Sequence, residues 1–322
     1  MRRRNKRSDA RLKIARRKAA IYQNSDPLNH QPQTLSLKSA IAKSIAEPYC
    51  QAETSSLALE NGLDSGFVKV IHCYSINKAG SQPDECEDAY IWQIEADVGR
   101  FGVADGATES SFAKEWARQL VSQFVRASIP KTPSTQKHTN EEESHGKFSL
   151  YDWLTPLQKT WETWLAGQDL LWFAKRKAEQ GTYATLLGLE IDANRQWQAI
   201  AVGDSCLFVV RDFVLLHSFP LAHSREFSYR PQLLGTKMPI RDDLNPIMAH
   251  FITHKAEVGD RFYLVTDALA AWIFASLETH KNPWVELDSI NTQADFLDWV
   301  THLRNRQEMT NDDTTLLHIQ IQ

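Results

Sequence analysis

The sequence lacks the features that most quickly assign a chain to a secreted, membrane or zinc-binding class. Its 322 residues include four cysteines that lie far apart and form no C-x-x-C pair, Cys50, Cys73, Cys86 and Cys206. This argues against both a disulfide framework and a thiolate zinc site. No stretch approaches the roughly 18 uninterrupted apolar residues of a membrane span. The basic start, MRRRNKRSDARLKIARRK, lacks the apolar segment of a secretory signal. We therefore expect a cytoplasmic protein without a transmembrane segment.

Signatures of nucleotide binding and of a nucleophilic side chain are also missing. The 13 glycines are dispersed and form neither G-x-x-x-x-G-K nor G-x-G-x-x-G. No Cys-His or Ser-His arrangement indicates a covalent mechanism, and we interpret Cys206 as a small buried apolar residue. His250 and His254 are four residues apart, but the residues between them suit a strand and no catalytic Glu adjoins, so we interpret both as structural. The acidic stretch RDDLNP (241–246) is typical of an ordinary loop.

The small net charge of -4 hides an uneven distribution. Of the 36 basic and 40 acidic residues, ten and one lie in residues 1–22, which leaves 26 against 39 and a net charge of -13 for the rest. We predict a basic N-terminal arm and linker over residues 1–60, followed by a folded domain over 66–322. The arm could contact nucleic acid, an anionic membrane surface or the acidic domain itself. Because it lacks interleaved aromatics and an apolar face, a solvated tail is the simpler interpretation.

Apolar periodicity predicts a domain of hairpins and helices. Helices are predicted over residues 109–126, 150–179, 268–277 and 296–306. Strands are predicted over residues 67–74, 90–95, 99–103, 182–191, 197–202, 206–211, 214–217, 261–266 and 314–321. The four strands between residues 182 and 217 have connections too short for parallel crossovers, which favours one antiparallel meander. We place the tryptophans of the second helical region in the core rather than against a cofactor: Trp153, Trp161, Trp164 and Trp172.

Acidic residues stand at the ends of several predicted strands: Asp88, Asp105, Asp204, Asp267, Asp312 and Asp313. A carboxylate beyond the end of a strand has left the hydrogen-bonded ladder and can project into a cleft. Several such acids would repel one another unless a cation lay between them, and Mg²⁺ and Mn²⁺ prefer oxygen ligands. Each acid alone is equally explained as a turn or cap residue. Together, the set favours a divalent metal site.

Five motifs, in this order, resemble those of metal-dependent protein phosphatases of the 2C type, above all the divergent bacterial branch. They are CEDAY (86–90), FGVADGATES (101–110), AVGDSCLFVVRD (201–212), YLVTDALA (263–270) and NDDTTLL (311–317). The resemblance spans residues 66–322. It implies an α+β fold, a four-layer α-β-β-α sandwich of two antiparallel sheets flanked by helices, with two Mg²⁺ or Mn²⁺ ions at one end of the sheets.

The resemblance also implies roles for individual residues. Asp88 and Asp105 would bind the metals directly, with Asp105 bridging the two ions. The backbone carbonyl of Gly106 would bind one ion, and Asp267 and Asp312 would bind the other.

Two further acids receive roles from the same resemblance. Glu87 would orient metal-bound waters, and Asp204 aligns with an acid that helps to hold a third, weaker ion in bacterial members. A water between two metals has a lowered pKa and can attack a phosphoryl group in line. The implied substrates are phosphoserine or phosphothreonine proteins, with a cognate kinase as a possible partner.

Three positions depart from the family pattern. The stretch NKAGSQPDECED lacks the Arg that many members use to hold phosphate. Lys78 is the nearest cation in the sequence and is the candidate for binding the substrate phosphate, although the point charge of an ammonium group holds phosphate less well than a guanidinium fork. DGATES stands where eukaryotic members have a DGHG pattern, and Ala268 follows Asp267 where Gly is usual.

We expect a phosphoprotein phosphatase. The alternative is a catalytically weak regulatory module that binds phosphoproteins and retains the metal site. A third hypothesis makes the basic arm a nucleic-acid or membrane tether.

Overall fold

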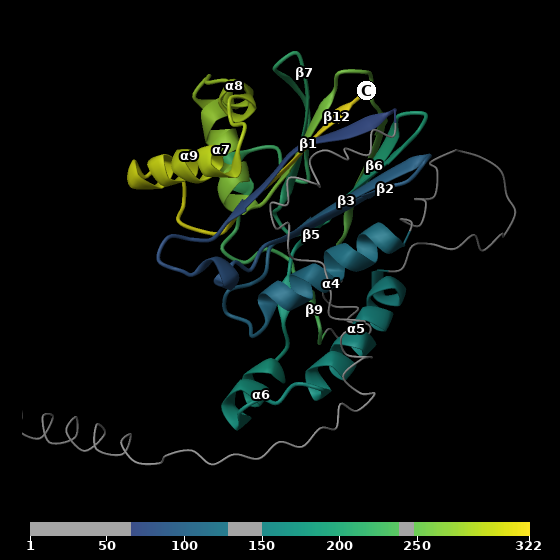
Figure 1. Ribbon diagram of the computed structural model, residues 1–322, viewed down its shortest axis with the longest axis vertical. Helices are drawn as coiled ribbons and strands as arrows, with labels where there is room; N and C mark the ends of the chain where they lie inside the picture. Colours follow the sequence, from purple (N-terminus) through teal and green to yellow (C-terminus); the bar gives the residue numbers. More distant parts are fainter. Residues whose placement is uncertain (1–65, 128–149, 238–247) are drawn as a thin grey trace, which may run out of the picture. The chain divides into compact units, whose positions relative to one another are not determined.

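Two five-stranded antiparallel sheets stack against each other at the centre of the fold (Figure 1). The computed structural model describes residues 66–127, 150–237 and 248–322. The first sheet has the order β1 (Val68–Ile76), β12 (Thr314–Ile321), β11 (Arg261–Val265), β7 (Cys206–Arg211) and β8 (Val214–Phe219). The second sheet has the order β10 (His250–Lys255), β6 (Gln196–Val202), β5 (Leu186–Asp192), β3 (Val98–Ala104) and β2 (Ala89–Ile94). A short ladder pairs β4 (Tyr183–Ala184) with β9 (Leu234–Gly235).

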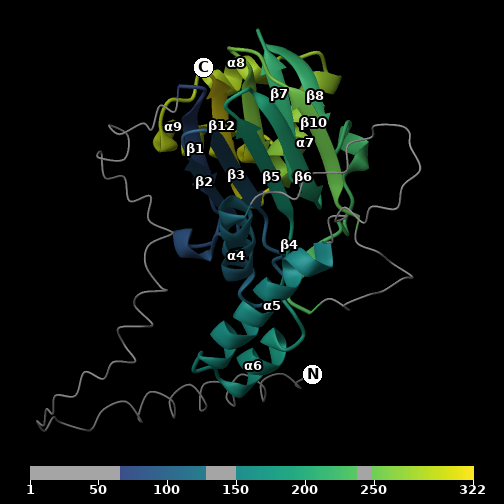
Figure 2. The ribbon, with the colours of Figure 1, turned by 90° about the vertical axis from the view of Figure 1, so that its right-hand side faces the viewer.

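Helices cover the outer face of each sheet, as Figures 1 and 2 show. Against the first sheet lie α7 (Asp267–Glu278), α8 (Pro283–Asp288) and α9 (Gln293–Asn305). Against the second sheet lies α4 (Ala113–Arg126), and α5 (Leu150–Ala166) packs against α4. The chain also forms α6 (Trp172–Ala178) and two 3₁₀ turns, η1 (Pro83–Glu85) and η2 (Ser224–Glu226). The predicted α+β class and its four-layer α-β-β-α sandwich are confirmed.

The layer between the sheets follows from the alternation of apolar residues along the strands. In β12, Leu317, Ile319 and Ile321 point into this layer, as the sequence predicts. Leu316 packs on the opposite face, against the helices. A strand that is apolar on both faces must be covered on both sides, because each buried side chain contributes about 1.5–3 kcal/mol. The outer helices meet this requirement.

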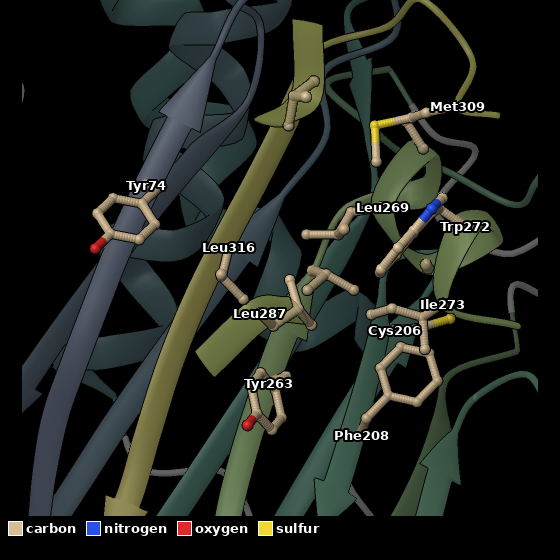
Figure 3. Close-up of a cluster of buried hydrophobic side chains, with 14 of the residues drawn as sticks. Tyr74, Cys206, Phe208, Tyr263, Leu269, Trp272, Ile273, Leu287, Met309 and Leu316 are labelled. Carbon is tan, nitrogen blue, oxygen red and sulfur yellow. The ribbon is translucent and has the colours of Figure 1, made fainter. Parts of the chain in front are cut away.

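The outer layers are formed by apolar stripes on the helices. In α7, Leu269 and Ile273 pack towards Leu316 of the first sheet (Figure 3). On the other side, Trp116 of α4 packs edge-on against Trp161 of α5, with ring centroids 5.6 Å apart. Within each helix, the apolar residues recur at helical spacing and therefore lie on one face. That face packs towards the neighbouring layer.

Two helix boundaries differ from the prediction. The first helix begins at Ala113 rather than at residue 109, because Phe112 adopts a left-handed backbone conformation with φ of 62°. The helical region predicted over 150–179 is two helices, α5 and α6, which residues 167–171 separate.

The prediction of a single meander between residues 182 and 217 is wrong. β5 pairs with β6 in the second sheet, whereas β7 pairs with β8 in the first. The chain changes sheet at Gly203, whose φ is +104° and where a Cβ would lie 2.6 Å from Thr185 Cγ2. In the sequence this turn resembles a hairpin turn. In the structure it joins the two sheets and places Asp204 at the junction.

The predicted place of Trp172 in the core is also wrong. Trp161 is buried, and Trp153 and Trp164 pack partly buried beside it, but Trp172 is 75% exposed. The break after α5 starts a new helix, so Trp172 does not continue the apolar stripe of α5.

Other predictions are confirmed or lie outside the described residues. Cys206 is fully buried, and His250 and His254 lie on the strand β10, as the residues between them predict. Within the part of the chain that the structure describes, no helix is long and apolar enough to cross a membrane. The predicted arm over 1–60 and the acidic loop over 241–246 lie outside that part.

Candidate metal centre

Two of the predicted acids lie side by side at one end of the second sheet. Asp88 immediately precedes β2, and Asp105 immediately follows β3. Because Ala89 pairs with Ala104, the two acids occupy neighbouring positions just beyond the last rung of the ladder.

Three further acids with a predicted metal-binding role lie at the ends of strands of the first sheet. Asp267 follows β11, while Asp312 and Asp204 precede β12 and β7, the strands on either side of β11. Both neighbours run antiparallel to β11, so their starts lie at the end of β11. We call the five residues the acid cluster: Asp88, Asp105, Asp204, Asp267 and Asp312.

The hydrogen bonds that Asp88 accepts show that the two groups of acids share one end of the sandwich. Asp88 Oδ2 accepts hydrogen bonds from Thr266 Oγ1 at 3.0 Å and from Thr315 Oγ1 at 2.7 Å, both of which belong to the first sheet's side. The other oxygen, Oδ1, is buried and has no hydrogen-bond partner. A buried carboxylate oxygen without a partner is costly, and it is available to a cation.

Burial, in most cases together with the charge of neighbouring acids, raises the pKa values of four residues of the acid cluster. Burial, and then the charge of Asp313, raises the pKa of Asp88 well above its usual range. Burial, and then the charge of Asp88, does the same to the pKa of Asp105. Burial and the charge of Asp204 raise the pKa of Asp267 to about 7, and burial raises the pKa of Asp204 to about 6. Each shift disfavours the charged form, and positive charge placed among these groups would reverse it.

Gly106 lies so close to the chain around Glu87 that no side chain fits. A Cβ on Gly106 would lie 2.8 Å from the carbonyl oxygen of Glu87 and 2.9 Å from Ala113 Cβ. Gly106 also forms a β-bridge with Ala184. Glycine therefore allows the segment after Asp105 to approach the segment before Asp88.

Lys78 lies beside Glu87, and its side chain spans two loops of the site. Lys78 Nζ donates to Glu87 Oε2 at 3.5 Å and to Thr108 Oγ1 at 3.2 Å. Burial lowers the pKa of Lys78, but the neighbouring carboxylates, Glu87 first, raise it overall. The structure thus places the predicted substrate-binding cation next to the predicted water-orienting acid.

Asp313 fixes the loops that carry Lys78 and Glu87, a role that the sequence analysis missed. Its Oδ1 accepts the backbone N–H of Lys78 at 2.7 Å, and its Oδ2 accepts the backbone N–H of Glu87 at 2.6 Å. Asn311 forms a second clamp: it accepts the backbone N–H of Ala79 at 2.7 Å and donates to the carbonyl of Ala79 at 3.2 Å. The only sequence signal for these contacts was the position of both residues in the NDD motif.

Arg304 of α9 is a second residue that the sequence analysis missed. Its guanidinium donates to the backbone carbonyls of Asn77, at 3.0 Å, and of Asp312, and to Thr314 Oγ1 at 2.9 Å. Its Nε is buried without a partner, and burial lowers its pKa. Arg304 thereby ties the segment before Lys78 to the segment that carries Asp312. Because these contacts join distant parts of the chain, no local pattern in α9 predicts them.

The donor set suits hard divalent cations. Carboxylate and carbonyl oxygens are the ligands that Mg²⁺ and Mn²⁺ prefer, and Asp88 Oδ1 is a buried oxygen in need of a partner. Over residues 66–127, 150–237 and 248–322, no three His, Cys, Asp or Glu side chains are already gathered closely enough to hold one ion. Carboxylates that carry like charges move apart, and Mg²⁺ usually keeps several waters. The residues therefore fit ions that are held by a few carboxylates together with carbonyl oxygens and water.

A cavity of about 130 Å³ opens beside the acid cluster. Its lining includes Gly203 and Asp204 from the turn between the sheets, together with Glu226 and His250. It has room for a few waters, each of which takes about 30 Å³ in the liquid.

Comparison with known proteins finds matches among solved structures only. No family model and no curated protein matches the chain. A serine/threonine phosphatase from S. agalactiae matches at 16% identity and a TM-score of 0.48, over 78% of this chain and 99% of that one. The catalytic domain of the serine/threonine protein phosphatase PstP, in complex with two manganese ions, matches at 15% identity and a TM-score of 0.46, over 79% and 98%. RsbX in complex with magnesium matches at 17% identity and a TM-score of 0.44, over 80% and 96%. The chain is a distant structural match to serine/threonine phosphatases.

Proposed function

We propose that this chain is a Mg²⁺- or Mn²⁺-dependent phosphatase that hydrolyses phosphoserine or phosphothreonine in proteins. The acid cluster carries the proposal, because five carboxylates from five separate segments converge at one end of two sheets. Such a group of partly buried like charges is unfavourable unless cations compensate it. The sequence motifs that contain these acids supply the expected reaction class.

In this proposal Asp88, Asp105, Asp267 and Asp312 hold two cations, together with the backbone carbonyl of Gly106. The chemistry that two divalent cations supply is polarisation of the phosphoryl oxygens and activation of a water for in-line attack. No side-chain nucleophile is then required, in keeping with the absence of a Cys-His or Ser-His pair in the sequence.

The remaining predicted residues have supporting roles. Glu87 orients water by accepting hydrogen bonds, and Lys78 offers its charge to the substrate phosphate. Asp204, beside the small cavity, holds a third and weaker ion. The substrates are phosphoproteins in the cytoplasm, and a cognate serine/threonine kinase acts as the opposing enzyme.

Hydrolysis of p-nitrophenyl phosphate by the full chain with Mn²⁺ tests this proposal. The exchanges Asp105→Asn and Asp267→Asn should each abolish turnover, because each removes a charged oxygen ligand while keeping the size of the side chain. Asp298→Asn is the matched control, since Asp298 is an exposed acid on α9; it should leave turnover unchanged. A folded, Mn²⁺-loaded protein without any turnover would contradict the proposal.

One observation favours a second function, a phosphoprotein-binding regulatory module with weak catalysis. The ammonium group of Lys78 is already engaged by Glu87 and Thr108, and residues 77–88 contain no arginine. A paired point charge holds a phosphate less firmly than a free guanidinium fork. Calorimetry with a phosphoserine peptide separates the two functions: tight binding without phosphate release indicates the module, and release indicates the enzyme.

A further inference from the structure

The start of α6 exposes three large apolar residues in succession. Leu171, Trp172 and Phe173 are 67%, 75% and 56% exposed. The rings of Trp172 and Phe173 touch each other edge to face, with centroids 5.9 Å apart. In the described part of the chain, no other three consecutive large apolar residues are all exposed. Exposure of this kind costs free energy in water and marks an interaction site.

Three cations follow the apolar residues at a distance of one helical turn. Lys175, Arg176 and Lys177 come four residues after Leu171, Trp172 and Phe173, and the backbone N–H of Lys175 donates to the carbonyl of Leu171 at 3.0 Å. Four residues of helix advance about 6 Å along the axis. Trp172 and Phe173 therefore each have a cation, Arg176 and Lys177, one turn further along on the same side of the helix, and Leu171 precedes them as the N-cap residue.

The three cations are exposed and have no side-chain partner among the described residues. Two exposed acids, Asp169 and Glu179, flank the segment in the sequence, but neither forms an ion pair with it in the described structure. We call residues 171–177 the α6 tip. In Figures 1 and 2, α6 lies beyond the end of α5 and away from both sheets, and the side chains of Leu171, Trp172 and Phe173 are exposed.

We propose that the α6 tip docks onto the surface of an anionic lipid bilayer. Leu171, Trp172 and Phe173 would enter the boundary between headgroups and acyl chains, where aromatic residues are favoured. Lys175, Arg176 and Lys177, about 6 Å further along the axis, would lie at the level of the lipid phosphates. The charge of the tip is complementary to that of such a surface.

The size of the patch argues against a stable protein partner. Two aromatic side chains of about 150–250 Å² each and one leucine cover less than the roughly 800 Å² that each partner contributes to a standard interface. A lipid surface has no such requirement, although firm anchoring takes a second signal. The ten basic residues within 1–22 are available in the sequence as that second signal. This proposal does not depend on the proposed phosphatase activity.

Sedimentation of the full chain with lipid vesicles tests the proposal. Vesicles of equal parts phosphatidylcholine and phosphatidylglycerol should bind the protein, and pure phosphatidylcholine vesicles should bind it much less. The double exchange Trp172→Ser with Phe173→Ser should weaken the partition coefficient at least about tenfold. Val285→Ser with Leu297→Ser is the matched control, because these apolar residues are 55% and 48% exposed on other helices; it should leave binding unchanged.

A charge variant separates the tip from the basic arm. Replacing Lys175, Arg176 and Lys177 by Gln should weaken binding to the anionic vesicles and leave the low binding to neutral vesicles unaltered. If vesicle binding survives the exchange of Trp172 and Phe173, another segment carries that binding and the proposal is overturned. Absence of binding to anionic vesicles would also overturn it, as would self-association that depends on Trp172 and occurs without vesicle binding. Hydrolysis of p-nitrophenyl phosphate by the same variants should be unchanged, so the two proposals can fail separately.

Discussion

Asp88 and Asp105 lie side by side at the ends of paired strands, yet they are held in different ways. Asp88 is anchored, because Thr266 and Thr315 donate to its Oδ2 from the other sheet. Among the described residues, Asp105 forms hydrogen bonds to distant segments through its backbone: its N–H donates to Thr185 Oγ1 at 2.9 Å, and its carbonyl accepts the N–H of Thr185 at 2.8 Å.

The same contrast separates Asp313 from Asp312. Both oxygens of the Asp313 side chain accept backbone N–H groups from distant loops, whereas the half-buried side chain of Asp312 accepts, among the described residues, only the backbone N–H of Asp313. We call Asp88 and Asp313 the anchored acids, and Asp105 and Asp312 the unanchored acids. The anchored acids hold the two sheets and their loops in register. The unanchored acids are free to adjust to what they bind, as expected if ligands complete the site.

The largest effect is expected from removing an anchor. Asp313→Ala should lower the free energy of unfolding by about 3 kcal/mol, because the backbone N–H groups of Lys78 and Glu87 both lose their acceptor. Chemical denaturation measures the change. Asp298→Ala, at an exposed position, is the control and should change stability by less than about 0.5 kcal/mol. An Asp313→Ala protein as stable as this control would show that the anchor does not hold the loops.

A smaller loss of stability should follow from a change that pushes apart the segment before Asp88 and the segment after Asp105. Gly106→Ala would place a Cβ against the carbonyl of Glu87 and against Ala113, and neither can move without shifting the backbone. We expect a loss of about 2 kcal/mol in unfolding free energy, together with weaker Mn²⁺ binding.

Gly167→Ala is the matched control for this steric effect. A Cβ at Gly167 would meet only the carbonyl oxygens of Trp164, at 3.4 Å, and Thr163, at 3.8 Å. The control should leave both stability and Mn²⁺ binding close to those of the parent. Equal behaviour of the two variants would contradict the tight approach at Gly106.

The exchange of Arg304 tests whether the position of the unanchored Asp312 depends on a neighbouring residue. Arg304→Lys keeps the charge but cannot donate to Asn77, Asp312 and Thr314 together. We expect Mn²⁺ affinity, measured by calorimetry, to fall about tenfold, the effect typical of residues that orient a metal ligand. Arg306→Lys, an exposed exchange beyond the end of the same helix, should leave the affinity unchanged. If both exchanges behave alike, Arg304 does not position Asp312.

The last prediction concerns the pH dependence of stability and a histidine outside the acid cluster, whose titration must not be mistaken for that of the acids. Burial, and then the charge of His72, lowers the pKa of His318 to about 3, from 6.5. The unfolded chain therefore binds a proton at this residue below about pH 6.5 that the folded chain does not bind until about pH 3. Stability from this group is fully present above pH 6.5 and is lost as the pH falls.

The slope of that loss is at most about 1.4 kcal/mol per pH unit for one residue. His318→Gln should make the fall in unfolding free energy between neutral and acid pH shallower, whereas His223→Gln, at an exposed position, should not. An unaltered slope in His318→Gln would mean that other groups account for the acid sensitivity.

The parts of the site that could be predicted from the sequence are those with a local signal. Asp88, Asp105 and Asp267 each adjoin an apolar strand, so the end of the strand and the acid are visible together. The alternation of β12 likewise predicts its inner face, because the period of two is a local property.

The parts that could not be predicted depend on contacts between distant segments. Arg304 donates mainly to backbone carbonyl groups, which every residue has, so the sequence carries no mark of these contacts. Asp313 is adjacent to Asp312 and of the same type, so the sequence does not distinguish their roles. The turn at Gly203 has the length of a hairpin turn, and only the packing of the two sheets decides that it crosses between them. Trp172 follows the stripe of α5 in sequence, but the break at residues 167–171 removes it from that stripe.

Anomalous scattering from crystals soaked in Mn²⁺ shows directly whether the acid cluster holds two ions. We expect two peaks at the end of the sheets, within coordination distance of Asp88, Asp105, Asp267 and Asp312. The unanchored Asp105 and Asp312 should turn towards the ions while Thr266 and Thr315 keep Asp88 in place. Crystals that bind Mn²⁺ elsewhere, or that show no peak among these four acids, would contradict this expectation.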